Sequence, residues 1–304
     1  MLFNRQSTIT FEAALRDLHS TDPRVRAAAA DALGDVPVAA DRVRAREGLE
    51  LVLDDGRFEV RCAAALALGD LGDPAAVDAL LERMGDSHPE ARQAAVIALG
   101  KLGNAKAVPA LLTALTGGPP DVRFQAARSL AEIDPKAAFE PLCAALRDSD
   151  PEVRESAAEA LAVVNDRRAA GWLGDLLDDE RPGTRFAAAM TLAWLGEGRA
   201  FDTLVAALPD RERAFEAMEG LEAIGDARAA LPLAAQMRRF LLPQVLRVRA
   251  AAALLTLAPA DPAAPAARAL LEKSAKSSKL DVRGLAEECL ARLAGGAPAA
   301  EPQA

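Results

Sequence analysis

The stretch EVRCAAALALGDLG, residues 59–72, decides the fold because it recurs along the chain. Similar stretches are EARQAAVIALGKLG at 90–103, DVRFQAARSLAEID at 121–134, EVRESAAEALAVVN at 152–165 and GTRFAAAMTLAWLG at 183–196. The arginines of these five stretches are spaced 31 residues apart. Shorter matches surround Arg26 and Arg283. A period of this length indicates a repeat protein, in which each repeat packs against its neighbours.

Each repeat is predicted to form two helices. Apolar residues at offsets −1, +3, +7 and +10 from the arginine share one face of the second helix, and a similar stripe precedes it. Cap residues mark the helix ends: Asp73, Asn104, Asp134 and Asp166 before first helices, and Gly72, Gly103, Gly196 and Gly225 after second helices. The nine predicted pairs lie near residues 8–37, 41–72, 73–103, 104–134, 135–165, 166–196, 197–225, 226–258 and 262–294.

This repeated motif resembles the short HEAT repeats of phycobilisome-lyase-like proteins, over residues 8–294. The resemblance implies an all-α fold, an armadillo-like α-solenoid of about nine antiparallel helix pairs. The composition agrees, because 72 Ala and 43 Leu favour helix, while the lack of Tyr disfavours a β-sandwich. Residues 1–294 are expected to form the solenoid, and residues 295–304 a disordered tail.

Composition also argues against several classes of function. A net charge of −9 is unfavourable for binding nucleic acid or an anionic membrane. The two histidines, His19 and His88, do not form a metal-binding pair, and the three cysteines lie far apart. No stretch is apolar enough to span a membrane. We therefore expect a cytoplasmic protein without a metal, a cofactor, a nucleic-acid partner or a membrane-inserted segment.

The expected function is that of a non-enzymatic scaffold or adaptor that binds another protein or peptide. The family resemblance leaves one alternative open, a bilin lyase or a chaperone-like modifier of a chromoprotein. No residue in the sequence identifies a chromophore site, so the scaffold is the leading hypothesis.

A partner-binding face is predicted on the second helices of repeats four to seven. Offsets +1 and +5 from the arginine lie beside the apolar stripe, and in these repeats they carry aromatic and acidic residues. The predicted partner-binding residues are Phe124, Arg128, Glu155, Glu159, Phe186, Trp194, Phe215, Glu219 and Glu222. Such a strip suits a basic or amphipathic peptide. The alternative is that the rings fill the core.

A second candidate surface lies in residues 227–260, which contain five arginines and no acidic residue. The residues predicted to bind an acidic segment or a phosphate are Arg238, Arg239, Arg247 and Arg249. The alternative is a lengthened helix or loop with solvated arginines. For the arginine ladder, defined as Arg26, Arg61, Arg92, Arg123, Arg154, Arg185 and Arg283, we expect structural bonds to acids and carbonyl groups at the turns between repeats. The acids nearest in sequence are Asp22, Glu59, Glu90, Asp121, Asp150 and Glu152.

Overall fold

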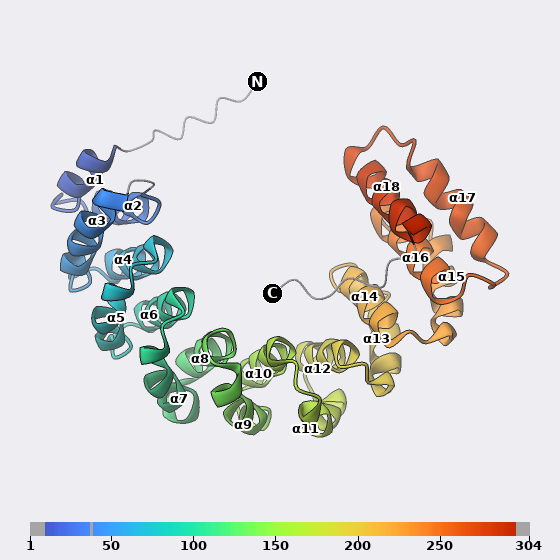
Figure 1. The fold of residues 1–304 in the computed structure, drawn as a ribbon, viewed down its shortest axis with the longest axis horizontal. Helices are drawn as coiled ribbons and strands as arrows, with labels where there is room; N and C mark the ends of the chain where they lie inside the picture. The colour runs from blue at the N-terminus through green and yellow to red at the C-terminus, as the bar shows by residue number, and fades with distance from the viewer. Residues whose placement is uncertain (1–9, 37–38, 296–304) are drawn as a thin grey trace. The chain divides into compact units, whose positions relative to one another are not determined.

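The computed structural model describes residues 10–36 and 39–295. In these residues eighteen α-helices follow one another as nine pairs, and no strand is present, which confirms the predicted fold class (Figure 1). Gly295, which the sequence placed in a disordered tail, is the last residue of a helix. The rest of that predicted tail, residues 296–304, lies outside the described residues.

Each pair consists of a first and a second helix. The first helices are α1 (Phe11–Asp17), α3 (Ala39–Val52), α5 (Val77–Arg83), α7 (Val108–Gly117), α9 (Pro135–Ala145), α11 (Ala170–Asp175), α13 (Phe201–Ala207), α15 (Ala230–Arg238) and α17 (Ala264–Ser274). The second helices are α2 (Pro23–Leu33), α4 (Phe58–Leu71), α6 (Pro89–Leu102), α8 (Pro120–Ile133), α10 (Pro151–Val164), α12 (Pro182–Trp194), α14 (Ala214–Ile224), α16 (Gln244–Leu257) and α18 (Leu280–Gly295). Single 3₁₀ turns are η1 (Pro74–Ala76), η2 (Ala105–Ala107), η3 (Arg167–Ala169), η4 (Leu176–Asp178), η5 (Gly198–Ala200) and η6 (Ala227–Ala229).

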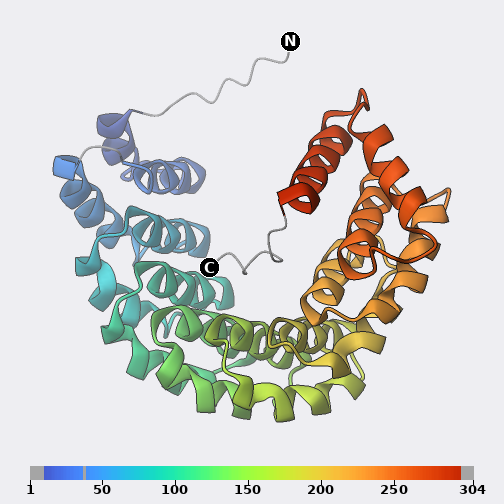
Figure 2. The ribbon, with the colours of Figure 1, turned by 45° about the vertical axis from the view of Figure 1, so that its right-hand side comes forward.

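The chain divides into two compact units, Met1–Val164 and Asn165–Ala304. In the first unit the second helices α2, α4, α6, α8 and α10 pack side by side in chain order. The first helices of that unit form a separate row, as Figures 1 and 2 show in two views. In the second unit α12, α14, α16 and α18 also pack in succession. Each unit is therefore built by the contact of each repeat with the next.

Small residues allow the second helices to approach closely. A Cβ atom added to Gly69 of α4 would lie 2.8 Å from the Cα atom of Ala98 in α6. The predicted core leucines Leu68 and Leu99, at offset +7 from their arginines, are fully buried. The high alanine content thus has a physical cause: close helix packing leaves little room for larger side chains.

The predicted caps are present. The Asp73 side chain accepts a hydrogen bond from the backbone N–H of Ala75 at 3.0 Å, and Asn104 and Asp166 do the same for the residues two positions later. Gly72, like the other three predicted C-cap glycines, has a positive φ angle. Asn165 occupies the equivalent position after α10 with a φ angle of 52°. Local sequence therefore sets where these helices begin and end.

Candidate interaction surfaces

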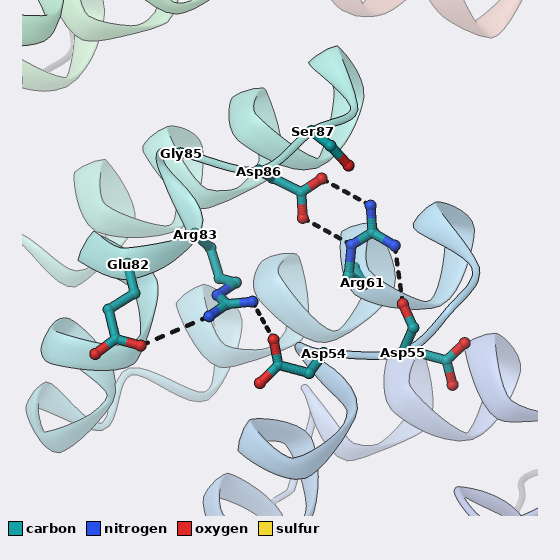
Figure 3. Close-up of a pocket in the computed structure, with 8 residues that line it drawn as sticks. All are labelled: Asp54, Asp55, Arg61, Glu82, Arg83, Gly85, Asp86 and Ser87. Carbon is teal, nitrogen blue, oxygen red and sulfur yellow. Dashed lines mark hydrogen bonds and ion pairs between the residues drawn. The ribbon is translucent and has the colours of Figure 1, made fainter.

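The ladder arginines occupy one structural position, the fourth residue of their second helix. The Arg61 guanidinium donates hydrogen bonds from Nε and Nη2 to the two carboxylate oxygens of Asp86, both at 2.7 Å, and from Nη1 to the Asp55 carbonyl oxygen at 2.8 Å (Figure 3). Equivalent pairs are Arg26–Asp55 at 2.7 Å, Arg92–Asp121 at 3.1 Å and Arg123–Asp148 at 2.7 Å. Arg154 and Arg185 donate to the carbonyl oxygens of Asp148 and Asp179. These bonds agree with the expected structural role for six of the seven ladder arginines, whereas no such bond is seen for Arg283 among the described residues.

The acids that pair with the ladder differ from those nearest in sequence. Each paired aspartate belongs to the following repeat, 25 to 29 residues after its arginine. Of the six acids nominated from sequence proximity, only Asp121 forms such a pair, and it bonds Arg92. The expected bonds to acids between repeats are therefore present, but most of the partners are not the acids nearest in sequence. A carboxylate just before the arginine does not reach the guanidinium, whereas an aspartate at or just before the start of the next second helix does. The signal in the sequence is an aspartate six residues before the next arginine, as at Asp55, Asp86 and Asp148.

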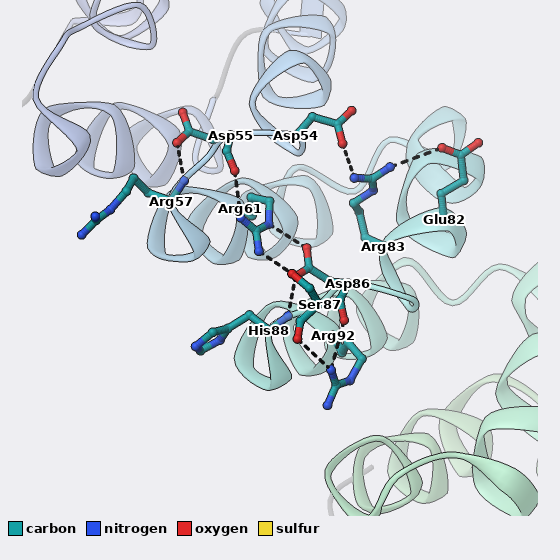
Figure 4. A network of polar contacts seen from close by, with 10 residues as sticks. All are labelled: Asp54, Asp55, Arg57, Arg61, Glu82, Arg83, Asp86, Ser87, His88 and Arg92. Atoms are coloured by element: carbon teal, nitrogen blue, oxygen red, sulfur yellow. Dashed lines mark hydrogen bonds and ion pairs between the residues drawn. The ribbon is translucent and has the colours of Figure 1, made fainter.

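The ladder aspartates also organise their own turns. The Asp86 carboxylate accepts a hydrogen bond from the backbone N–H of His88 at 2.8 Å in addition to the Arg61 bonds (Figure 4). The Arg61 bonds lower the pKa of Asp86, and those of Arg26 lower the pKa of Asp55. For Asp148 burial raises the pKa, but the bonds from Arg123 and the backbone outweigh burial and the net shift is downward. The ladder therefore joins consecutive repeats through ionised carboxylates.

A shallow hollow of about 340 Å³ lies at the outer edge of this network in the first unit (Figure 3). Asp54 and Glu82, whose side chains are 76% and 75% exposed, both pair with Arg83 there. The remaining charged residues that line the hollow are the ladder arginine Arg61 and the aspartates Asp55 and Asp86, which pair with ladder arginines. The hollow is thus a surface of the structural network.

The first unit carries four of the predicted partner-binding residues, on the neighbouring helices α8 and α10. Phe124 and Glu155 are half-buried, and Arg128 and Glu159 are exposed. Arg128 and Glu159 line one hollow of about 100 Å³, together with Glu132, Ala160 and Val163. Arg128 and Glu159, which both lie five residues after the ladder arginine of their repeat, are therefore neighbours in the structure.

In the second unit Phe186 is only 9% exposed. The Arg213 guanidinium carbon lies 5.4 Å from the centre of its ring, and both residues line a hollow of about 250 Å³ with Asp210. Trp194, in the last turn of the same helix, is half-buried. Phe186 thus packs between α12 and the turn before α14, and little of its ring reaches the surface.

The other predicted residues of the second unit surround a buried ion pair. Arg249 on α16 is 2% exposed and donates two hydrogen bonds to the Glu222 carboxylate on α14, at 2.8 and 2.5 Å. The Arg249 guanidinium also lies 5.4 Å from the centre of the Phe215 ring. Burial raises the pKa of the half-buried Glu219 nearby. Glu222 and Arg249, assigned from sequence to two separate surfaces, bind each other inside the unit, so neither charge is presented to an external ligand.

Arg238, Arg239 and Arg247 lie at the connection between α15 and α16. Arg247 is the fourth residue of α16 and therefore occupies the position that the ladder arginines hold in other repeats. Its Nε atom donates to the carbonyl oxygen of Met237 at 2.8 Å. Arg238 and Arg239 are exposed. Of the four predicted anion-binding arginines, these three remain close to the surface.

Three observations concern groups that could take part in metal binding or catalysis. No group of three or more His, Cys, Asp or Glu side chains has the geometry to hold a metal ion. Burial raises the pKa of the Cys62 thiol to about 11, so the thiol is protonated at neutral pH. The ring of His88 stacks on Phe58 at 3.6 Å between centroids. No helix in the described part of the chain is long and apolar enough to cross a membrane.

Comparison with protein families identifies the repeats. The HEAT-repeat family matches residues 46–131, 109–179 and 139–225, which together cover more than half of the chain. The chain belongs to the HEAT-repeat family. The resemblance stated from the sequence is therefore confirmed, and the structure continues the same HEAT helix pairs beyond the matched region through α18.

Solved structures resemble the chain at low sequence identity, and the first two below, with TM-scores above 0.5, share its fold. Kap95, in a complex with Nup1, has a TM-score of 0.65 and 17% identity, and the match covers 93% of this chain and 44% of Kap95. YibA of Escherichia coli has a TM-score of 0.58 and 18% identity, covering 84% of this chain and 94% of YibA. The CpcE–CpcF phycocyanin lyase complex of a Nostoc species has a TM-score of 0.44 and 24% identity, covering 90% of this chain and 97% of that one. No curated protein matches the chain by sequence.

Proposed function

We propose that this HEAT-repeat protein is a non-enzymatic scaffold or adaptor that binds a partner protein or peptide on its second helices. The main support for this proposal is the surface formed by α8 and α10. There Phe124, Arg128, Glu155 and Glu159 are all at least partly exposed. Glu132 and the 57% exposed Val163 extend this surface. We call these six residues the α8–α10 surface.

The chemistry of the α8–α10 surface favours a basic, amphipathic peptide. Three carboxylates outnumber one guanidinium, and Phe124 and Val163 supply apolar contact area. Aromatic anchors surrounded by charged residues are typical of protein-binding surfaces. The net charge of −9 adds a long-range attraction for a basic partner.

The relatives support this proposal at the level of protein binding. Kap95 is a solenoid of the same fold, and its structure is a complex with another protein, Nup1. The protonated Cys62 thiol and the stacked His88 ring are consistent with a non-catalytic protein. A cytoplasmic location is part of the proposal. The alternative of a bilin lyase has no supporting contact among the described residues, and bilin absorbance after co-expression is its readout.

The test measures binding of a short fluorescent peptide with Lys and Leu at helical spacing, against the same peptide with Glu in place of Lys. We expect Glu155→Lys combined with Glu159→Lys to weaken binding of the basic peptide about tenfold or more, because two attractive charges become repulsive. Glu90→Lys with Glu140→Lys, two exposed acids elsewhere in the first unit, is the charge-matched control. Equal loss in both double variants, or no binding by the wild-type protein, would contradict the proposal.

A further inference from the structure

The connection between α15 and α16 exposes two large apolar side chains next to each other. Phe240 is 89% exposed and Leu241 is 80% exposed. Among the described large apolar residues these are the two most exposed, and Phe240 is the one aromatic in that group. An aromatic residue held in water at this extent is unfavourable unless a partner covers it. The pair is therefore a candidate for contact with a partner.

Hydrogen bonds hold this connection in a defined shape. The Arg211 Nη2 atom donates to the Leu241 carbonyl oxygen at 2.9 Å, the Arg247 Nε atom to the Met237 carbonyl oxygen at 2.8 Å, and the Arg239 Nη1 atom to the Gln236 side-chain oxygen at 2.9 Å. Leu242, the next residue, is only 5% exposed and anchors the segment. Phe240 and Leu241 are thus presented by a fixed backbone, which lowers the entropic cost of binding.

The arginines around the apolar pair keep their positive charge uncompensated. Each of the three hydrogen bonds ends on a neutral oxygen, and within the described residues Arg211, Arg238 and Arg239 form no ion pair with a carboxylate. Residues 227–260 contain no acidic residue. The acids that border this range are already engaged, because Asp226 pairs with Arg228 and the Asp261 carboxylate accepts a hydrogen bond from the backbone N–H of Ala263. Arg211 lies between Asp210 and Glu212 in sequence, and the Asp210 carboxylate caps the backbone N–H of Glu212. The ladder arginine Arg61, by contrast, is neutralised by Asp86.

We propose that Phe240, Leu241 and the exposed guanidinium groups of Arg211, Arg238 and Arg239 bind an acidic, amphipathic segment of a partner protein. We call these five residues the α15–α16 loop site. Carboxylates of the segment pair with the guanidinium groups, and its apolar residues cover Phe240 and Leu241. A short segment is the occupant because it contacts only this basic loop, whereas an extended anionic membrane would also face the rest of a chain with a net charge of −9. The inference rests on the proposed protein-binding function but concerns a different surface and a partner of opposite charge.

The test uses the full-length protein and a short fluorescent peptide in which Glu and Asp flank Leu and Phe at helical spacing, with a Lys-substituted copy as the comparison. We expect wild-type protein to prefer the acidic peptide, and added salt to weaken that binding. Phe240→Ser with Leu241→Ser, and separately Arg238→Glu with Arg239→Glu, should each weaken it about tenfold or more. All four residues are exposed, so the melting temperature should change little, and Arg238→Glu alone, which leaves the Arg239–Gln236 hydrogen bond in place, should also weaken binding.

Matched controls separate the site from general charge and apolarity. Arg24→Glu with Arg268→Glu changes two other exposed arginines, and Leu51→Ser changes a 71% exposed leucine of the first unit. These variants should bind the acidic peptide like wild type. The inference is overturned if the wild-type protein does not prefer the acidic peptide, or if the control and loop variants lose binding equally. It is also overturned if the protein does not bind the peptide but sediments with phosphatidylserine vesicles in a way that depends on Phe240. If the protein binds only the basic peptide, at the α8–α10 surface, this inference is contradicted while the proposed function is supported.

Discussion

Single ladder pairs are expected to contribute measurable stability. The Arg123 and Asp148 side chains are 15% and 14% exposed, so their pair is neither a surface salt bridge nor fully buried. We expect Arg123→Ala to lower the free energy of unfolding by about 1–3 kcal/mol, between the values for exposed and buried pairs. Denaturant unfolding measures the change. Arg128→Ala, on the exposed side of the same helix, is the control and should have little effect; equal losses would contradict the structural role of the ladder.

The buried pair of Glu222 and Arg249 should behave differently from the ladder. With side chains 5% and 2% exposed, removal of one partner leaves the other charge buried without compensation. We expect Glu222→Ala to cost about 3–5 kcal/mol of unfolding free energy. The double variant Glu222→Leu with Arg249→Met should recover most of that loss, because two apolar side chains fill the same space. If the double variant is as unstable as Glu222→Ala, an uncompensated buried charge does not explain the loss of stability in Glu222→Ala.

The structural roles of residues that recur with the 31-residue period could be predicted from the sequence, and the roles of residues that do not recur could not. The leucine at offset +7 recurs in all five stretches and the glycine at offset +11 in three of them, so the burial of these leucines and the positive φ angles of these glycines followed from sequence. The ladder carboxylates were missed because each lies on the following repeat. Arg249 and Glu222 were missed as a pair because neither residue recurs in the other repeats, and only the packing of α16 on α14 brings them together.

At the scale of helices, the end of α10 depends on one unusual residue. Asn165 has a φ angle of 52°, a conformation that glycine supplies after α4, α6, α12 and α14. We expect Asn165→Ala to cost about 1 kcal/mol, because a Cβ atom strains this conformation and alanine lacks the polar side chain that eases it. Asn165→Gly should change the unfolding free energy by less than about 0.5 kcal/mol. Glycine adopts the positive φ angle more easily than asparagine, but it also gives the unfolded chain more conformational freedom, and these two effects oppose each other. Thermal unfolding measures both, and a neutral alanine variant would contradict this account.

Connections between helices show the limit of the repeat pattern. Several turns before a second helix contain an aspartate that binds the ladder arginine of the preceding repeat, namely Asp55, Asp86 and Asp148. The α15–α16 connection lacks such an acid, and the ladder residue Arg247 bonds a carbonyl oxygen ten residues earlier instead. The sequence identified the excess of arginine there. The exposure of Phe240 could not be predicted, because it depends on the shape of this turn. Hydrogen bonds from Arg211, Arg239 and Arg247 define that shape, and no local sequence pattern indicates them.

For the whole molecule, the ladder makes stability depend on acid pH. Stability in a HEAT protein is approximately a sum over repeats and their interfaces, so similar ion pairs at successive interfaces add. The pKa values of Asp55, Asp86 and Asp148 are lowered in the folded protein. A lowered folded-state pKa gives stability that is complete above the unfolded value of about 3.9 and is lost as pH falls through the folded value. Burial raises the pKa of Asp31 and Glu219, which act in the opposite direction but are fewer.

We therefore expect the melting temperature to be nearly constant from pH 7 to about pH 5 and to fall steeply below about pH 4, as the ladder carboxylates take up protons. Asp86→Asn should lower the melting temperature at pH 7, because the charged partner of Arg61 is lost. It should also flatten the decline below pH 4, since this variant has one fewer carboxylate to protonate. Asp70→Asn, which changes a 53% exposed side chain paired with Lys101, is the control and should keep the wild-type slope. An Asp86→Asn profile parallel to wild type would show that the acid sensitivity arises outside the ladder.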